Sequence, residues 1–350
     1  MSVDTMSVSR GYHTSTFIPE DNSVLIMGGI YGAVYHSSVQ KYIPSTGCFQ
    51  AMRDMPRARY MHSADQLSSL SGYVVIAGGV NSINGILNVA DLYHPVTGDI
   101  ITISLSSPRY IHTSTVLSSS QLVLTGGYTT GIPSVMVASS DMIDTSFNSL
   151  FTAGSNTMNE VRIYHTATLL GNNSDLVLVA GGYNGGAVSS AYLYHGSSNA
   201  FVSLGTGVAL LPARYAHAAT YLPPPINKVL ITGGVVSPSA SGLMTLFDVV
   251  TLTFTTLSTT LTHPRYYHTA TLLPNGKVLV TGGYSTSAMV TCELIDPSMN
   301  FTVTSAASLV TPRFVHTATL IPDNDNGTVL VCGGYISIGN SIDSCELYFV

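Results

Sequence analysis

Short apolar stretches recur along the whole chain, each about as long as one β-strand and each followed by turn residues. The clearest example follows Arg265. Thr, Ala and Leu alternate over residues 269–273, which predicts a strand with one buried face. The sequence Pro274-Asn275-Gly276 comes next, and Asn-Gly favours a tight hairpin turn because both residues readily adopt positive φ angles. The apolar run within residues 277–281 then predicts a second strand that is covered on both faces.

Two further strands complete this unit. The pattern predicts a third strand near residues 292–295, a turn at Asp296-Pro297-Ser298 and a fourth strand from Asn300. Four short strands separated by turn signals are typical of one blade of a β-propeller. No stretch of the chain keeps a helical period of apolar residues, so we expect an all-β fold.

The same unit is repeated seven times, and each copy carries an Arg followed three residues later by a His. The pairs are Arg10/His13, Arg59/His62, Arg109/His112, Arg162/His165, Arg214/His217, Arg265/His268 and Arg313/His316. In each copy the second strand ends at two Gly residues, at 28–29, 78–79, 126–127, 181–182, 233–234, 282–283 and 333–334. We expect Gly there because a side chain would collide with a neighbouring backbone. A period near fifty residues predicts a seven-bladed β-propeller with four-stranded antiparallel blades.

At this level of detail the chain resembles the Kelch-repeat family, including the repeats of the galactose oxidase propeller. The matching features are the Gly pairs, an acidic residue two positions before a Tyr or Ile in the third strand, and a Tyr directly after four of the Gly pairs (Tyr128, Tyr183, Tyr284 and Tyr335). The resemblance covers residues 1–350 and implies one propeller domain. Kelch units usually carry Trp in the fourth strand, and this chain has no Trp. Its place is taken by Phe49, Ile100, Phe151, Phe201, Phe254 and Phe301, which we expect to fill the space between blades.

The closure of the ring is the irregular part of the pattern. The last unit ends after its third strand at 345–348, so a short N-terminal strand should complete the last blade. Only nine residues precede Arg10, so residues 1–6 would form a shortened strand without the usual aromatic anchor. Either the ring closes weakly, or the chain is a piece of a longer protein; we favour the second interpretation.

Composition narrows the function classes. Charged residues are only 9% of the chain, yet no apolar run approaches the ~18 residues of a spanning helix, so membrane insertion is not expected. The net charge of −6 disfavours nucleic-acid binding. Residues 1–10 contain no apolar signal-peptide region, whereas three glycosylation sequons, at Asn172, Asn300 and Asn326, favour an extracellular parent protein. Cys332 and Cys345 lie in adjacent predicted strands and are candidates for a disulfide.

Alternating connections should place the repeat Arg residues and the loops after the Gly pairs on one face of the ring. Those loops, at 30–38, 80–89, 128–139, 183–189, 235–242, 284–290 and 335–342, contain no Asp, Glu, Lys or Arg. The opposite face should carry the acids of the hairpin turns, which are Glu20, Asp21, Asp99, Asp144, Asp175, Asp296, Asp323 and Asp325. We therefore expect a two-sided charge distribution, with a basic face and an acidic face.

The repeat Arg residues have two interpretations. As structural groups they would pair with third-strand acids, and the expected members of these pairs are Arg59, Arg109, Arg162, Arg313, Asp91, Asp141, Glu293 and Glu346. As functional groups they would attract an anionic partner, and Arg10, Arg214 and Arg265 are the best candidates because fewer acids match their neighbourhoods. The repeat His residues should form hydrogen bonds at blade junctions and not a metal cage.

The sequence therefore predicts a non-catalytic recognition scaffold without a metal or cofactor. We expect a protein or peptide partner, possibly acidic, to bind across the Arg-bearing face through loop residues Tyr128, Tyr183, Asn184, Tyr284 and Tyr335. The alternative is lectin-like carbohydrate binding through stacked Tyr rings. The His residues outside the repeat motif are His36, His94, His195 and His263, and of these His94 and His195 occupy equivalent turns on the expected acidic face and cannot meet at the axis. A copper radical oxidase like galactose oxidase is therefore a more remote alternative.

Overall fold

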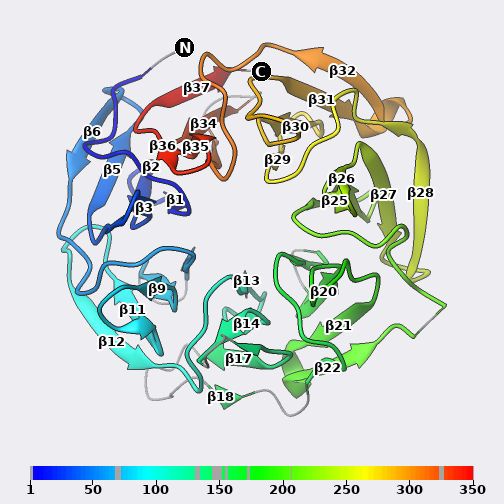
Figure 1. Ribbon diagram of the computed structural model, residues 1–350, viewed down its shortest axis with the longest axis horizontal. Helices are drawn as coiled ribbons and strands as arrows, with labels where there is room; N and C mark the ends of the chain where they lie inside the picture. Colours follow the sequence, from blue (N-terminus) through cyan, green and yellow to red (C-terminus); the bar gives the residue numbers. More distant parts are fainter. Residues whose placement is uncertain are drawn as a thin grey trace.

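The computed structural model is a ring of seven blades around a central axis (Figure 1). It describes residues 3–67, 72–130, 135–143, 152–153, 157–171, 174–205, 207–322 and 327–349. Within each blade, consecutive strands pair antiparallel and progress outward from the axis. The predicted seven-bladed propeller is therefore confirmed. Phe151, Asp144, Asp323, Asp325, Asn172 and Asn326 lie outside the described residues. No helix in the described part of the chain is long and apolar enough to cross a membrane.

The first three blades follow the repeat in order. Blade 1 contains β1 (Thr14–Ile18), β2 (Ser23–Met27), β5 (Val39–Ile43) and β6 (Cys48–Ala51). Blade 2 contains β7 (Ser63–Gln66), β8 (Val74–Ala77), β11 (Val89–Tyr93) and β12 (Ile100–Ser104). Blade 3 contains β13 (Thr113–Val116), β14 (Leu122–Thr125), β17 (Ser140–Ile143) and β18 (Thr152–Ala153).

The other blades repeat this arrangement. Blade 4 contains β19 (Thr166–Leu169), β20 (Leu176–Ala180), β21 (Ala191–His195) and β22 (Ala200–Ser203). Blade 5 contains β23 (Ala218–Leu222), β24 (Lys228–Thr232), β27 (Leu243–Asp248) and β28 (Thr253–Thr260). Blade 6 contains β29 (Thr269–Leu272), β30 (Val278–Thr281), β31 (Cys292–Asp296) and β32 (Thr302–Ala306). Blade 7 contains β33 (Thr317–Ile321), β34 (Thr328–Cys332) and β37 (Cys345–Phe349).

Small two-stranded hairpins follow the Gly pairs in five blades. They are β3 (Ile30–Tyr31) with β4 (Val34–Tyr35), β9 (Val80–Asn81) with β10 (Gly85–Ile86), β15 (Tyr128–Thr129) with β16 (Val135–Met136), β25 (Val235–Val236) with β26 (Ser239–Ala240), and β35 (Tyr335–Ser337) with β36 (Asn340–Ser341). These hairpins were not predicted as strands. They give the loops of this face regular backbone pairing.

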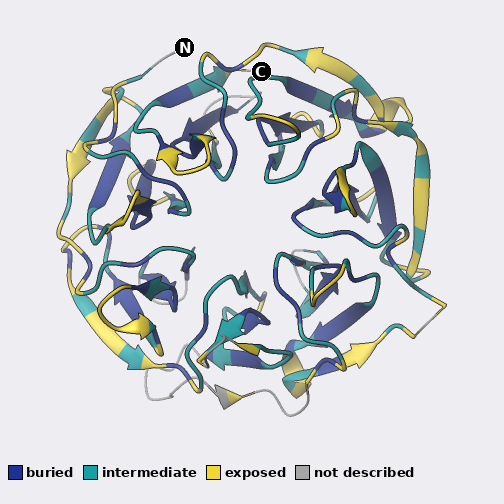
Figure 2. Cartoon of the chain, in the orientation of Figure 1, coloured by how far each residue is buried: buried dark blue, intermediate teal, exposed yellow. Residues whose placement is uncertain are grey.

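The core lies between neighbouring blades. Leu230 and Leu246 of blade 5, for example, pack with Val278, Val280 and Ile295 of blade 6. The second and third strands are buried and the outermost strands are exposed (Figure 2). This burial explains why the second strands read as nearly continuous apolar runs: both of their faces are covered.

The first residue of each Gly pair must be Gly, as predicted, because a side chain there would collide with the backbone of the next blade. Gly282 has a φ of +56°, and a Cβ atom there would lie 2.5 Å from the carbonyl oxygen of Arg313 in the next blade. The other six first glycines meet the carbonyl of the next repeat Arg in the same way. A side chain at this position would push two blades apart.

The fourth-strand aromatics fill space between blades, as predicted, since Phe201 and Phe301 belong to core clusters shared with the preceding blade. Several of them also contact a ring of their own blade. The ring of Phe254 lies 4.9 Å from that of Phe247, and Phe201 lies 5.2 Å from Tyr194. Phe49 and Tyr42 repeat this contact in blade 1 at 5.2 Å. The absent Trp is thus replaced by a pair of smaller rings on adjacent strands.

The N-terminal segment closes the ring beside β37. The amide of Val3 donates to the carbonyl of Cys345, and the amide of Met6 donates to the carbonyl of Asp343. These residues occupy the place of a fourth strand without forming a regular ladder. A disulfide joins Cys332 to Cys345 in the adjacent strands β34 and β37.

The closing segment has no aromatic anchor, as expected, but it is held by a different buried side chain that was not predicted. Met6 is 2% exposed and packs with Tyr42 and Cys345. Its position, four residues before the repeat Arg, is a buried Met or Leu in every unit: Met6, Met55, Leu105, Met158, Leu210, Leu261 and Leu309. The buried side chain that holds the closure of the ring therefore lies in the connection that leads into blade 1, just before the repeat Arg, and not in a fourth strand.

Candidate functional site

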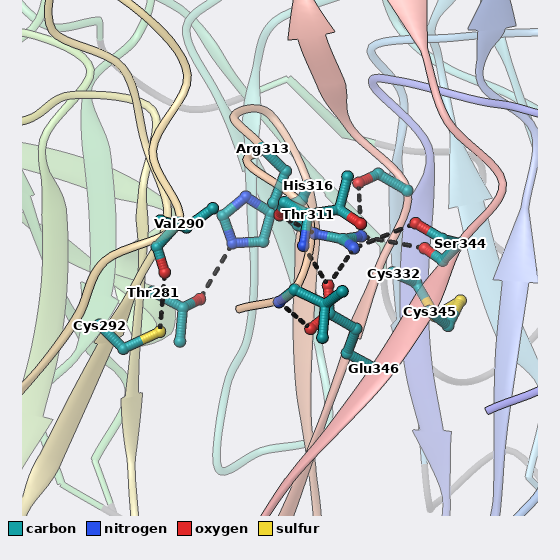
Figure 3. A network of polar contacts seen from close by, with 12 residues as sticks. Thr281, Val290, Cys292, Thr311, Arg313, His316, Cys332, Ser344, Cys345 and Glu346 are labelled. Carbon is teal, nitrogen blue, oxygen red and sulfur yellow. Dashed lines mark hydrogen bonds and ion pairs between the residues drawn. A yellow bond between two sulfur atoms is a disulfide. The ribbon is translucent and has the colours of Figure 1, made fainter. Parts of the chain in front are cut away.

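Each repeat Arg joins its own blade to the preceding one. The side chain of Arg313 donates from Nη1 to the carbonyls of Gly333 and Ser344, at 3.0 and 2.9 Å (Figure 3). Its Nη2 donates to the Glu346 carboxylate at 2.6 Å, and its backbone carbonyl accepts from Gly283 of blade 6. A planar guanidinium can satisfy several acceptors at once, which makes Arg the right residue for this junction.

The structural interpretation of the Arg ring is supported in every blade, because all seven side chains are fully buried. Ion pairs join Arg59 to Asp91, Arg109 to Asp141, Arg265 to Glu293 and Arg313 to Glu346. Arg162 pairs instead with Glu160 at 3.6 Å and lies over the ring of Tyr192, 5.0 Å from its centre. Glu160 was not among the predicted partners.

The prediction that Arg10, Arg214 and Arg265 are free to bind was wrong. Arg265 donates to Glu293 at 2.8 Å. Arg10 donates to the hydroxyl of Ser38 and the side-chain oxygen of Gln40, and Arg214 donates to the hydroxyl of Thr245. Neutral oxygens thus replace the acid where the third strand has none. Burial lowers the pKa of Arg10 and Arg214 to about 10, so both side chains remain charged at neutral pH without reaching solvent.

The basic half of the predicted two-sided charge distribution was wrong. The seven Arg side chains face the interior, so they give no basic face. All three Lys residues of the chain pair with Asp at the strand ends of the other face: Lys41 with Asp21, Lys228 with Asp248 and Lys277 with Asp296. That face therefore carries mixed charges.

The repeat His residues link neighbouring blades, as predicted. His62 Nε2 lies 3.0 Å from Thr14 Oγ1 of the preceding blade, and His217 Nε2 lies 2.9 Å from Thr166 Oγ1. Burial lowers the pKa of His217 to about 3, so this imidazole is neutral at physiological pH. In the described residues, no group of three or more His, Cys, Asp or Glu side chains is arranged to hold a metal ion.

A ring of left-handed residues lies beside the Arg and His residues. The residue two positions after each repeat Arg has a φ of 52–54°, and these residues are Tyr12, Met61, Ile111, Tyr164, Ala216, Tyr267 and Val315. Their backbones are linked from blade to blade, as in the bonds from Met61 N to Tyr12 O and from Tyr267 N to Ala216 O. The strained turn places the side chain of this position on the loop-bearing face.

Aromatic residues gather on this face into what we call the tyrosine cup. Of the predicted residues, Tyr183, Tyr284 and Tyr335 belong to it and Tyr128 lies beside it, stacked on Tyr110 at 5.2 Å. Contacts between ring centres of 4.9–6.5 Å connect eleven rings in one series: Tyr35, Tyr60, Tyr12, Tyr335, Phe314, Tyr284, Tyr266, Tyr267, Tyr164, Tyr215 and Tyr183. Asn184 is exposed in the adjoining loop of blade 4.

Most of these rings were missed because they belong to the Arg motif. They stand one or two positions after the repeat Arg, as in Tyr60, Tyr164 and Tyr266. The backbone of the first position bridges to the residue after the Gly pair, for example Tyr266 to Tyr284 and Phe314 to Tyr335. An aromatic excess at these two positions was visible in the sequence, but its convergence depends on the left-handed turn.

A cavity opens in the cup between blades 6, 7 and 1. It has a volume of about 320 Å³ and is lined by Tyr12, Tyr266, Tyr267, Tyr284, Phe314, Tyr335, Ile338 and Gly339. Burial raises the pKa of Tyr12, Tyr267 and Tyr335 above the ordinary range, so their hydroxyls stay protonated. The site offers flat apolar rings and neutral hydroxyls, and the described residues that line it include no Asp, Glu, Lys, Arg or His.

The sequence was also compared with known proteins. No protein-family model matches the sequence, and no curated protein is significantly similar to it.

Proposed function

We propose that this protein is a non-catalytic recognition scaffold of the Kelch type, which holds a protein or peptide segment in the tyrosine cup. The observation that supports this most is the series of eleven contacting aromatic rings on one face. Buried aromatic anchors dominate the binding energy of protein interfaces, and Tyr adds a hydroxyl that can donate to a partner. Seven rigid blades hold these rings before the partner arrives, which reduces the entropic cost of binding.

The partner segment is uncharged in this proposal, which revises the expectation of an acidic ligand. All seven repeat Arg side chains are buried, and the loops of this face contain no Asp, Glu, Lys or Arg. Affinity should therefore depend on apolar contact and neutral hydrogen bonds, both of which are insensitive to ionic screening.

Carbohydrate binding is the second candidate. Tyr110 and Tyr128 are half-buried and nearly parallel, with an angle of 23° between their planes. Such a pair offers a flat face on which a sugar ring can stack. This candidate predicts that Tyr128→Ala abolishes binding of a neutral oligosaccharide.

Intrinsic Tyr fluorescence can be used to follow binding at the tyrosine cup. It has no Trp, and twelve of its twenty Tyr residues lie in or beside the cup, so Tyr emission follows this region directly. A panel of uncharged ten-residue peptides is titrated at about 0.05 and about 0.5 M NaCl. We expect saturable changes of emission with affinities that agree within about twofold between the two salt concentrations. Tyr284→Ala should weaken binding, and Tyr31→Ala is the control because Tyr31 is exposed on the same face outside the series of rings. If the affinity falls steeply with added salt, or if Tyr284→Ala leaves the affinity unchanged, the tyrosine cup is not the peptide-binding site.

A further inference from the structure

The cavity between blades 6, 7 and 1 points to a particular chemistry of partner. We propose that it binds a proline-rich segment in the polyproline II conformation. This inference rests on the proposed function and adds the class of peptide.

The walls of the cavity are aromatic rings set at angles to one another. The ring of Phe314 lies 4.9 Å from that of Tyr284 at an angle of 63°, and 5.7 Å from that of Tyr335 at 33°. Tyr12 contacts Tyr335 at 5.8 Å and 62°. Tilted rings present alternating faces and edges, which suit the compact saturated ring of proline. Aromatic-lined grooves of this kind are the usual receptors of polyproline II segments.

The hydrogen-bond donors of the cavity also match the acceptors of a proline-rich segment. A proline residue has a carbonyl acceptor but no N–H donor, so its receptor needs donors and few acceptors. The polar side chains of the cavity are Tyr phenols, and burial raises the pKa of Tyr12 and Tyr335, which keeps them protonated and able to donate. The Tyr267 hydroxyl is instead hydrogen-bonded to Tyr164. A polyproline II helix has no internal hydrogen bonds, so each of its carbonyls is open to such a donor.

The same lining disfavours a sugar at this point of the cup. Sugar hydroxyls need acceptors and paired donors such as carboxylates, amides or guanidinium groups. The described residues around the cavity supply none of these side chains. Asn81, in the loop of blade 2, is engaged with the carbonyl of Ala58 and with the amides of Ile83 and Asn84.

The cavity is fixed by the backbone. Phe314 bridges to Tyr335 and Tyr266 bridges to Tyr284, so two of its walls belong to short β-contacts. Tyr335 also rests on Gly11, where an added Cβ would lie 2.0 Å from Cε2 of the ring. Gly11→Ala must therefore displace Tyr335, and it alters the cavity without removing an aromatic group.

The test uses acetyl-decaproline-amide as the probe, with a Gly-Ser peptide of equal length as the control. Both are titrated into the full chain, and binding is followed by Tyr emission and by calorimetry. We expect saturable binding of decaproline only. Tyr335→Ala and Gly11→Ala should each weaken it about tenfold or more, whereas Tyr183→Ala, in blade 4 of the same cup, should leave it within about twofold. Tyr284→Phe keeps the ring and removes one hydroxyl, so it should weaken binding without affecting the fold.

Three negative outcomes are distinguishable. If decaproline does not bind but other uncharged peptides of the panel do, and Tyr284→Ala abolishes that binding, the proline inference is wrong and the proposed function stands. If decaproline binds equally well to Tyr335→Ala and Gly11→Ala, the segment lies elsewhere and the inference is also wrong. If no peptide binds at all, both are wrong.

Discussion

His13 and Thr317 are separated by 304 residues of sequence, yet the Nε2 atom of His13 lies 3.0 Å from Oγ1 of Thr317. This hydrogen bond joins blade 1 to blade 7 across the point where the ring closes. The same bond recurs at other junctions, as between His62 and Thr14 and between His112 and Ser63. The seam is thus held by the repeat itself as well as by the N-terminal segment beside β37.

Thr317→Ala should weaken the seam. The imidazole of His13 is buried, and the residue paired with Thr317 across the hairpin is Cys332, which is held in the disulfide. No other hydroxyl in the described structure is then bonded to His13 Nε2. A buried polar atom without a partner costs about 1–3 kcal/mol, so the free energy of unfolding in urea should fall by that amount.

Blade 6 provides the matched control for this substitution. His316 Nε2 lies near both Thr269 Oγ1 and its cross-strand partner Thr281 Oγ1, at 3.3 and 3.0 Å. Thr269→Ala therefore leaves one hydroxyl in place and should cost less than Thr317→Ala. Blade 5 already shows this compensation, because it has Ala218 at the equivalent position and His268 bonds to Thr232. Equal losses in the two variants would contradict the role of the hydroxyl.

The seven repeat His residues predict a loss of stability in mild acid. Burial lowers the pKa of His13, His112, His217 and His268 to about 3, and it holds those of His62, His165 and His316 well below the usual value. The unfolded chain, with imidazole pKa values near 6.5, then binds more protons than the folded one. Stability should be complete above about pH 6.5 and should fall progressively below it, by up to ~1.4 kcal/mol per pH unit for each imidazole.

Protonation of Asp65 changes the stability in the opposite direction, since it stabilises the folded state as the pH falls. Burial raises the pKa of this carboxyl to about 6, so the folded state binds its proton first and gains stability as the pH falls from about 6 toward about 4. One carboxyl cannot offset seven imidazoles. Urea unfolding between pH 5 and 7.5 gives the proton uptake from the slope, with Asp65→Asn as the variant that removes the opposing term. A stability that does not change over this range would show that the imidazoles are not buried as neutral groups.

The fold could be predicted because its determinants are local and repeated. The Gly pair and the alternating strands each indicate one feature of a blade, and both were confirmed in blade 6. The hairpin at Asn275-Gly276 also forms, but the expected turn type was wrong, because Gly276 has a positive φ of 80° and Asn275 does not. The anchor at Met6 was not predicted, because it lies four positions before the repeat Arg and not in the fourth strand. The sequence does carry a signal for it, since a Met or Leu stands at this position in all seven units.

The site could be predicted only in part, because charge was used as a guide to exposure. Arg10 and Arg214 lack a matching acid in sequence, but a guanidinium can be satisfied by carbonyls and hydroxyls that sequence spacing does not reveal. Convergence of Tyr12, Tyr164 and Tyr267 depends on a left-handed φ at non-glycine residues, which sequence patterns do not predict. The loop tyrosines were predicted because they follow a visible landmark, the Gly pair.

The Arg ion pairs should differ in importance from blade to blade. Asp141 accepts from Arg109 at 2.9 Å, and both side chains are buried. Asp141→Ala leaves an uncompensated buried charge and should lower the free energy of unfolding by about 3–5 kcal/mol. Thr245→Ala removes the neutral partner of Arg214 in blade 5 and should cost about 1 kcal/mol. Urea unfolding of both variants checks the difference, and a larger loss for Thr245→Ala would overturn it.

The left-handed ring stores strain that a single substitution can release. Ile111 is β-branched and has a φ of 54°, a conformation that only Gly adopts freely. Ile111→Ala removes the branched side chain but keeps the Cβ, whereas Ile111→Gly removes both. Gly should therefore be more stable than Ala at this position by about 1 kcal/mol, the reverse of their order in an ordinary strand. The comparison is made by urea unfolding, with the same two substitutions at Ile103 in β12 as the control, where Ala should be the more stable. If Ala is also the more stable at position 111, the turn is not strained, and the orientation of the tyrosine cup needs another explanation.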